Sequence, residues 1–207
     1  MEAILNILNQ CAVSFDLPIL DWIQANLQSE LLDTVMPIIT TFGDAGIFWM
    51  VCAVLLLFFP KTRRIGLGMG FAMAMGLLVC NVTLKPLVGR IRPYDYQINE
   101  LGRTWESLLV GGKLLIDTPH DFSFPSGHTI ASFEAAVVLL KNSKKMGIPA
   151  MILAVLIAFS RMYLYVHYPT DVIASIILGT ILAFIGDAIA AKVAPKLGAR
   201  KKGKYEA

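Results

Sequence analysis

Three short polar segments interrupt an otherwise apolar chain, and each lies at the end of an apolar run. They are Lys85–Pro93, Phe124–Thr129 and Ser160–Asp171. Together they contain two of the three histidines, with a lysine, two arginines and an aspartate that can serve a single site. Charged groups at a membrane edge are costly unless they have a function, so these segments indicate a site. Their residue types suit chemistry on a phosphate ester.

The third segment sets a histidine just before a helix and an aspartate in its first turn. Pro169 favours the first turn of a helix, so His167 precedes that helix and Asp171 lies within it. The carboxylate can then reach back to one imidazole nitrogen, fix the tautomer and leave the other nitrogen as a nucleophile. Arg161 is near the end of the preceding helix, so a short turn brings it close. The alternative is an exposed His–Asp pair at the membrane edge.

The middle segment has the features of a helix start that binds an anion. Ser126 is a good N-cap, Gly127 lets a ligand approach, and the amides of a helix N-terminus attract anions. His128 would face the same anion and could protonate a leaving oxygen. The alternative is a plain helix cap with an exposed histidine.

The first segment follows the run Ile65–Leu84 and supplies cations. Lys85 offers a compact charge, and Arg92 offers a planar fork for phosphate oxygens. Arg90 is two residues away and can point elsewhere. The alternative is that these basic residues are interfacial anchors.

The composition is that of a membrane protein. Of the 207 residues, 56% are hydrophobic and 16% are charged, and the mean hydropathy is +0.65. Soluble domains carry about 25% charged residues, so the charge content is low. The length suits a single domain over 1–207, and a net charge of only +3 argues against nucleic-acid binding.

Five apolar runs are candidates to span a bilayer as helices, which predicts an all-α fold. They are Ala45–Phe59, Ile65–Leu84, Ser126–Leu140, Met146–Ser160 and Val172–Ala191. Only the second is an uninterrupted run of spanning length, roughly 20 residues. We therefore predict a polytopic membrane helical bundle with five transmembrane helices, and six is the alternative.

The lysines and arginines predict how this bundle is oriented. Twelve of the 18 fall in three groups: Lys61, Arg63 and Arg64; Lys141, Lys144 and Lys145; and Lys192, Lys196, Arg200, Lys201, Lys202 and Lys204. If five consecutive helices cross the membrane in alternating directions, all three groups lie on the same face. The positive-inside rule makes that face cytoplasmic, together with the basic tail 192–207. The other six lie in Lys85–Lys113 or at Arg161. The predicted site is therefore on the outer face of the plasma membrane.

The N-terminal segment 1–44 contains acidic residues but no lysine or arginine, which fits the outer face. Leu17–Leu27 and Leu31–Phe42 have broken apolar patterns, and we interpret them as interfacial amphipathic helices. A sixth crossing through this region is the alternative. Gly43 is expected to end the second of these helices.

The outer-face loop 94–125 is expected to form a lid or a partly helical rim over the helical bundle 45–191. Within this loop, His120 and Asp121 could line an entrance, although a solvated pair is the simpler interpretation. Glu134 is a single charged residue inside an apolar run. An intramembrane carboxyl of this kind either pairs within the bundle or handles substrate or protons.

The spacing K-x6-R-P, then P-S-G-H, then S-R-x5-H-x3-D resembles the three signature motifs of the type 2 phosphatidic acid phosphatase superfamily. All signature positions are present and in the family's order. The helices over Ile65–Ala191 also resemble the family's membrane members in order and topology. The first 45 residues carry no signature, and the N-terminal helix of six-helix relatives is missing or replaced there.

The resemblance implies a role for each matched residue. His167 would attack phosphorus and form a phosphohistidine, and Asp171 would orient and stabilise it. His128 would protonate the departing group and then activate water. The phosphoryl oxygens would be held by Lys85, Arg92, Ser126, Gly127 and Arg161. The resemblance implies neither a metal nor another cofactor.

The implied substrate is a lipid phosphate or diphosphate in the bilayer, with no nucleic-acid partner and no indication of oligomeric state. Undecaprenyl diphosphate is favoured, and phosphatidylglycerophosphate and phosphatidic acid are the other candidates. Two different functions remain as alternatives. One is a phosphotransferase that passes the group to an alcohol. The other is a non-catalytic lipid-binding or transport protein, against which the intact His128, His167 and Asp171 argue.

Overall fold

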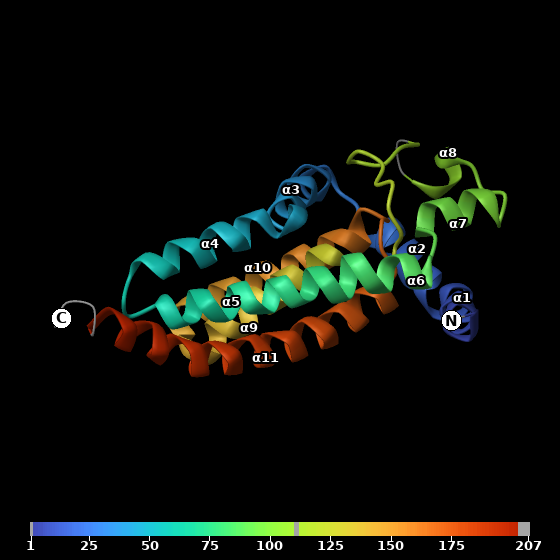
Figure 1. Cartoon of the computed structure of the whole chain (residues 1–207). Coiled ribbons are helices and arrows are strands. Elements are labelled where there is room, and N and C mark those ends of the chain that lie inside the picture. Colours follow the sequence, from blue (N-terminus) through green and yellow to red (C-terminus); the bar gives the residue numbers. More distant parts are fainter. Residues whose placement is uncertain (1, 110–111, 203–207) are drawn as a thin grey trace.

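The computed structural model describes residues 2–109 and 112–202, and within these ranges its regular structure is entirely helical, which confirms the predicted all-α class. Five helices form an elongated bundle (Figure 1): α4 (Ile47–Phe58), α5 (Arg63–Gly76), α9 (Gly127–Asn142), α10 (Lys144–Tyr163) and α11 (Pro169–Lys202). Shorter helices gather at one end of it: α1 (Glu2–Cys11), α2 (Leu17–Leu27), α6 (Lys85–Val88), α7 (Pro93–Asn99) and α8 (Trp105–Leu108).

Small residues let the central helices approach closely. α9 packs against α5, α10 and α11, and α5 packs against α11. A Cβ atom on Gly186 of α11 would come within 2.7 Å of the Ala72 nitrogen and the Gly68 oxygen of α5. Glycine at this position is therefore required for the α5–α11 contact, as is common where membrane helices pack.

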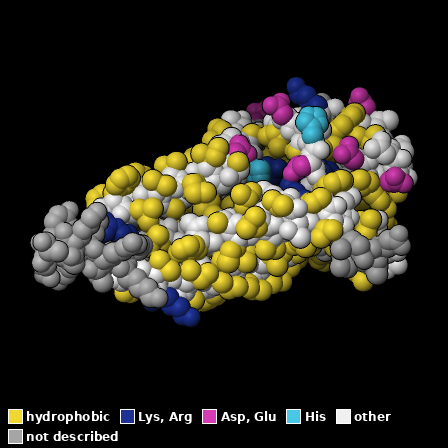
Figure 2. All heavy atoms as spheres, viewed as in Figure 1, with side chains coloured by type: hydrophobic (Ala, Val, Ile, Leu, Met, Phe, Trp, Pro, Cys, Tyr) yellow, Lys and Arg dark blue, Asp and Glu magenta, His cyan; other side chains and the backbone are white. Residues whose placement is uncertain are grey.

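Four helical stretches in the described chain are long and apolar enough to cross a membrane: Glu30–Phe58, Arg63–Asn99, Lys144–Tyr163 and Pro169–Pro195. Apolar side chains cover the flank of the bundle that Figure 2 shows, as expected for a surface in contact with lipid. With 16 residues, α9 is shorter, and α5, α10 and α11 surround it. Four of the five predicted apolar runs lie largely within one bundle helix each, whereas Ile65–Leu84 continues from α5 through the π-helical segment Leu77–Leu84.

The first of these stretches differs from the prediction. Helix α3 (Glu30–Thr41) does not end as an isolated interfacial helix, because it continues through the short 3₁₀ turn Asp44–Gly46 into α4. The two helices form one candidate span of 29 residues, and α3 packs against α10. Gly43 directly follows the end of α3, as predicted, but the chain then continues through the turn into α4, so Gly43 also marks a kink within a longer element. The division at residue 44 and the choice between five and six crossings stay predictions.

The two ends of the bundle carry different groups. The connections α4–α5 and α9–α10 and the C-terminal end of α11 lie at one end, and they carry the basic groups at Lys61, Lys141 and Lys192. The three polar segments lie at the opposite end, beside α6, α7 and α8 (Figure 1). The loop 94–125 is partly helical there, since it contains most of α7 and all of α8.

Candidate active site

Four parts of the chain meet at this end of the bundle. After α5, the π-helical segment Leu77–Leu84 leads into α6, and Lys85 begins that short helix. Arg92 is the residue just before α7, where Pro93 occupies the first helical position. The other two parts are the loop that precedes α9 and the turn between α10 and α11. Figure 2 shows the result as a hollow that holds a histidine and basic side chains and has acidic side chains around it.

His167 lies in the turn between α10 and α11 and is only 1% exposed. Its Nδ1 is 3.5 Å from Asp171 Oδ2 and 3.5 Å from Ser123 Oγ. The hydroxyl of Ser123 donates to the same Asp171 oxygen over 2.5 Å. The predicted His–Asp pairing is present but long, and Ser123 joins the two groups. Sequence reasoning did not single out Ser123, although it directly precedes the middle segment Phe124–Thr129.

The other imidazole nitrogen of His167 faces a cation. Arg92 Nη1 is 3.3 Å from Nε2 and also donates to the carbonyl of Val166 over 2.6 Å. Burial lowers the pKa of His167 well below its usual value, and the charges of Arg92, Arg161 and Lys85 lower it further. The imidazole is therefore neutral near pH 7. A neutral base among three cations is suited to an anionic ligand.

Asp121 occupies the space between the two cations of the first segment. Lys85 Nζ forms an ion pair with Oδ2 of Asp121, and Arg92 Nη2 forms one with Oδ1. Partial burial raises the pKa of Asp121, but the hydrogen bond from Lys85 and the charge of Arg92 outweigh it and hold that pKa well below the usual value. The carboxylate engages the groups that a phosphate would use. The side chain of Asp121 is 55% exposed and His120 is exposed too, as expected for a solvated pair, but the ion pairs of Asp121 were not predicted.

Arg161 projects from the last turn of α10 and is 3% exposed. Its Nη1 donates to Thr40 Oγ1 over 2.6 Å. Its Nε has no hydrogen-bond partner among the described residues. The guanidinium thus has donor capacity left beside the turn that holds His167.

The start of α9 is as predicted. Ser126 is the N-cap, since its Oγ accepts from the backbone N–H of Thr129 over 3.4 Å, and the residue is fully buried. Gly127 and His128 form the first turn. Nε2 of His128 is 2.7 Å from Oδ1 of Asp44, an aspartate in the kink between α3 and α4.

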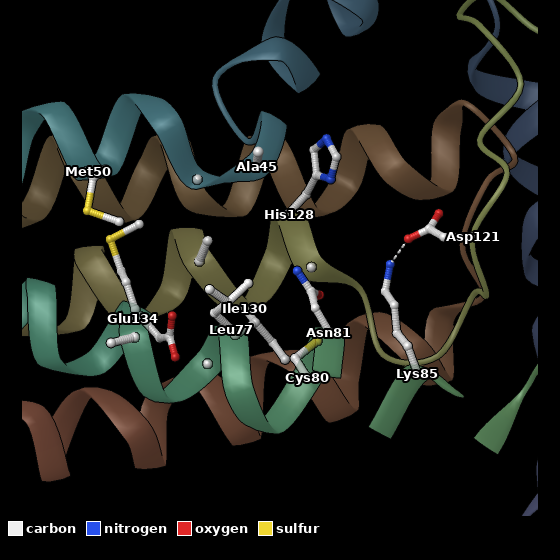
Figure 3. Close-up of a pocket in the computed structure, with 16 residues that line it drawn as sticks. Ala45, Met50, Leu77, Cys80, Asn81, Lys85, Asp121, His128, Ile130 and Glu134 are labelled. Atoms are coloured by element: carbon white, nitrogen blue, oxygen red, sulfur yellow. Dashed lines mark hydrogen bonds and ion pairs between the residues drawn. The ribbon is translucent and has the colours of Figure 1, made fainter. Parts of the chain in front are cut away.

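A cleft of about 350 Å³ runs from this polar end into the bundle, between α4, the end of α5 and α9 (Figure 3). Lys85, Asp121 and His128 line its polar end. Most of the remaining wall is apolar, with Met50, Met73, Leu77 and Ile130 among its residues.

Glu134 lines the same cleft, further along α9, and is 1% exposed. Its Oε1 has no hydrogen-bond partner among the described residues, so pairing within the bundle is not found for this atom. The carboxyl packs against Gly76, where a Cβ would come within 2.2 Å of Oε1. This contact explains why a glycine ends α5.

Arg90, whose orientation the sequence left open, pairs with buried aspartates and does not join the three cations Lys85, Arg92 and Arg161. It is fully buried, and its Nη2 donates to Asp16 Oδ2 over 2.8 Å. Its guanidinium lies 3.7 Å from the centre of the Tyr168 ring. Through Asp16, it ties the N-terminal helices to the rest of the site. No group of three or more His, Cys, Asp or Glu side chains among the described residues could hold a metal ion, and a metal-free reaction stays a prediction.

All eight residues predicted for the site lie at this end of the bundle, around His167 and the mouth of the cleft. A buried neutral imidazole, an aspartate behind it, three cations and a second histidine form an arrangement that can bind a phosphoryl group and transfer it.

Comparison with known proteins gives matches over most of the chain. The family model of the PAP2 superfamily matches residues 65–192. An undecaprenyl-diphosphatase from Sulfolobus acidocaldarius is 32% identical over 174 residues, which are 84% of this chain and 77% of the relative. Undecaprenyl-diphosphatase BcrC from Bacillus subtilis is 27% identical, over 76% of this chain and 74% of its own.

Among solved structures, a transmembrane PAP2 type phosphatidylglycerolphosphate phosphatase from Bacillus subtilis is similar, with a TM-score of 0.64 and 27% identity. The similarity covers 84% of each chain.

Proposed function

This chain belongs to the PAP2 superfamily and is a membrane lipid phosphatase, and we propose that it hydrolyses undecaprenyl diphosphate through a phosphohistidine at the outer membrane face. The observation that carries this proposal is the surroundings of His167. It is buried and neutral, with Asp171 on one nitrogen and the charge of Arg92 on the other. A nucleophile must be unprotonated, and the cations that keep it so also attract its anionic substrate.

In the first step, Nε2 of His167 attacks the terminal phosphorus. An N–P bond forms, and the bond from phosphorus to the bridging oxygen breaks. Asp171 holds Nδ1–H and stabilises the positive charge that develops on the ring. His128 gives a proton to the departing lipid phosphate.

In the second step, a water molecule attacks the phosphohistidine. His128, now neutral, accepts a proton from that water. The N–P bond breaks, inorganic phosphate leaves, and His167 returns to its neutral form. One bond to phosphorus forms and one breaks in each step, so the same groups can bind the phosphoryl oxygens in both steps.

The phosphoryl oxygens bind where the Asp121 carboxylate lies. Lys85 and Arg92 exchange that carboxylate for phosphate, and the Nε of Arg161 supplies a further donor. The first amides of α9, with Ser126 and Gly127 at the start of that helix, complete the cradle.

The apolar cleft supports a lipid substrate. A diphosphate bound beside His128 leaves the first carbons of its tail against Met73, Leu77 and Ile130, and the rest of the tail in the bilayer. Two of the relatives are named undecaprenyl-diphosphatases, and the similar structure is named for phosphatidylglycerolphosphate. Undecaprenyl diphosphate is therefore the leading substrate, and phosphatidylglycerophosphate is the next.

The outer-face assignment rests on charge. The basic groups near Lys61, Lys141 and Lys192 lie at the end of the bundle away from His167, and basic residues are retained on the cytoplasmic side. The same rule makes the C-terminus cytoplasmic. Labelling of single cysteines placed at residue 117 and at residue 144, in intact cells, tests this orientation.

The test of the function is phosphate release by the purified protein in detergent with a chelator present. The substrates are undecaprenyl diphosphate, phosphatidylglycerophosphate, phosphatidic acid and a soluble phosphate ester. Release from the diphosphate above the others, lost in His167→Ala, is the expected result. Release that persists in His167→Ala would remove His167 as the nucleophile. Transfer of phosphate to an added alcohol in place of release would favour the phosphotransferase.

A further inference from the structure

The second histidine of the site contacts a carboxylate that no signature motif contains. Asp44 Oδ1 is 2.7 Å from Nε2 of His128, although 84 residues separate the two in sequence. Asp44 comes from the kink between α3 and α4, in the part of the chain that carries no signature. The two residues meet only because the turn Asp44–Gly46 and α4 pack against α9.

Two consecutive residues of the kink have backbone conformations in the left-handed region. Ala45 has φ 48° and Gly46 has φ 68°, both in the left-handed region. Alanine rarely adopts this conformation, which persists where the surrounding structure enforces it, often at functional sites. A continuous helix through 41–47 would avoid this strain, so the distortion indicates that the kink has a task.

The kink also lies directly on the imidazole. A Cβ atom on Gly43 would come within 2.8 Å of Cδ2 of His128 and within 2.9 Å of a methyl group of Ile157. Any larger residue at position 43 would push the kink away from the ring. Two independent features, the strain at Ala45 and the close approach at Gly43, thus accompany the contact between Asp44 and His128.

A carboxylate in this place decides which nitrogen of His128 does the chemistry. When Asp44 accepts Nε2–H, the neutral ring carries its proton on Nε2, and Nδ1 is the nitrogen that can exchange a proton. When the ring is protonated, the carboxylate stabilises the added charge. Both effects assist a group that must first donate a proton and later accept one.

We propose that Asp44 is a positioning residue for His128, which it holds in one orientation and one tautomer for proton transfer to and from the reacting oxygens. This inference rests on the proposed role of His128 as general acid and base. It makes the kink between α3 and α4 part of the active site. The side chain of Asp44 is 58% exposed and that of His128 is 20% exposed, so the contact contributes little to folding stability.

The experiment compares two phosphate monoesters whose leaving groups differ in their need for a proton. Phosphatidic acid releases a poor leaving group, an aliphatic alcohol, whereas 4-nitrophenyl phosphate releases a phenolate that departs without a proton. The rate of alcohol or phenol release is measured in a single turnover, with enzyme in excess, for wild type, Asp44→Asn and Asp44→Glu. Each variant is compared with wild type on the same ester, so differences in binding between the esters cancel.

The expected result for Asp44→Asn is a loss of about tenfold to hundredfold with phosphatidic acid and little change with 4-nitrophenyl phosphate. Asp44→Glu should recover part of the lost rate, since it restores a carboxylate. An equal loss with both esters, or no loss with either, would overturn the inference. If wild type in its folded state releases neither alcohol nor phenol, and also no phosphate from undecaprenyl diphosphate, the proposed function fails instead.

Asp33→Asn is the matched control. Asp33 also lies on the α3 side of the kink and accepts a hydrogen bond from Tyr163 over 2.6 Å, but it does not contact His128. This variant should leave the rate ratio of the two esters at the wild-type value. Elution from a sizing column and the thermal unfolding midpoint in detergent establish that each variant is folded.

Discussion

Arg90 and Asp171 form an ion pair inside the protein, with Nη1 of the arginine 2.5 Å from Oδ1 of the aspartate and both side chains fully buried. Nη2 of Arg90 pairs with Oδ2 of Asp16. The aspartate that lies next to His167 is thus held from behind by a cation that never faces the substrate. This relationship connects the order of the N-terminal helices to the orientation of the nucleophile.

Replacing Arg90 should therefore destabilise the protein before it affects chemistry. Arg90→Gln leaves the carboxylates of Asp16 and Asp171 buried without their cation, and loss of one partner of a buried pair costs about 3–5 kcal/mol of unfolding free energy. Thermal unfolding in detergent measures the effect. Arg103→Gln is the control, because Arg103 pairs with Asp21 in a contact that is about 40% exposed, and it should change the unfolding midpoint little. An unchanged midpoint in Arg90→Gln would contradict this account.

Asp121 should compete with phosphate for its cations. Asp121→Asn removes the charge that Lys85 and Arg92 must exchange for substrate, so inorganic phosphate should inhibit about threefold to tenfold more strongly, as expected from two partly exposed ion pairs. Inhibition constants for phosphate, measured with a soluble ester, test this. Asp117→Asn serves as the control, since Asp117 is an exposed residue of the same loop. Weaker inhibition in Asp121→Asn would mean that the carboxylate holds the cations in place and does not compete.

Local sequence patterns predicted the parts of the site that depend on neighbours in the chain. Ser126 caps α9 because an N-cap needs only its own next three residues, and Pro169 fixes the start of α11 for the same reason. The number and order of the apolar runs predicted that the basic groups and the polar segments lie at opposite ends of the bundle. The three segments were expected to meet, and the structure brings them together.

The partners contributed from elsewhere in the fold could not be predicted. Asp44 reaches His128 across 84 residues, and the glycine beside it indicated a helix end, so the kink was not foreseen. Asp121 was interpreted as solvated because nothing in its own sequence shows that Lys85 and Arg92 face it. The roles of Ser123 and Arg90 could not be predicted for the same reason, since their shared partner Asp171 lies 48 and 81 residues away in sequence.

The cations around His167 should set the acid side of the pH profile. Burial and the charges of Arg92, Arg161 and Lys85 lower the pKa of His167 from its usual value of about 6.5. The neutral, reactive imidazole therefore persists at a pH below that value. Lys85→Met removes a positive charge and makes protonation of His167 easier. The acid limb of kcat/KM should then move to higher pH than in wild type on the same substrate, because ionisation of the substrate is common to both profiles. A limb that does not move, or moves to lower pH, would exclude Lys85 as an electrostatic partner of His167.

Arg161→Lys should reduce activity because the planar fork is lost while the charge remains. The Nη1 of Arg161 is engaged with Thr40 and its Nε has no partner among the described residues, so phosphate would be met by a donor that lysine does not have. A charge-assisted hydrogen bond contributes about 1.5–3 kcal/mol, which corresponds to a loss of about tenfold to hundredfold in kcat/KM. Thr40→Val is the matched control, since it removes the bond that orients the guanidinium but leaves the fork intact, and its loss should be smaller. A wild-type rate for Arg161→Lys would identify Arg161 as an anchor at the membrane interface, and the cradle would then consist of Lys85, Arg92 and the start of α9.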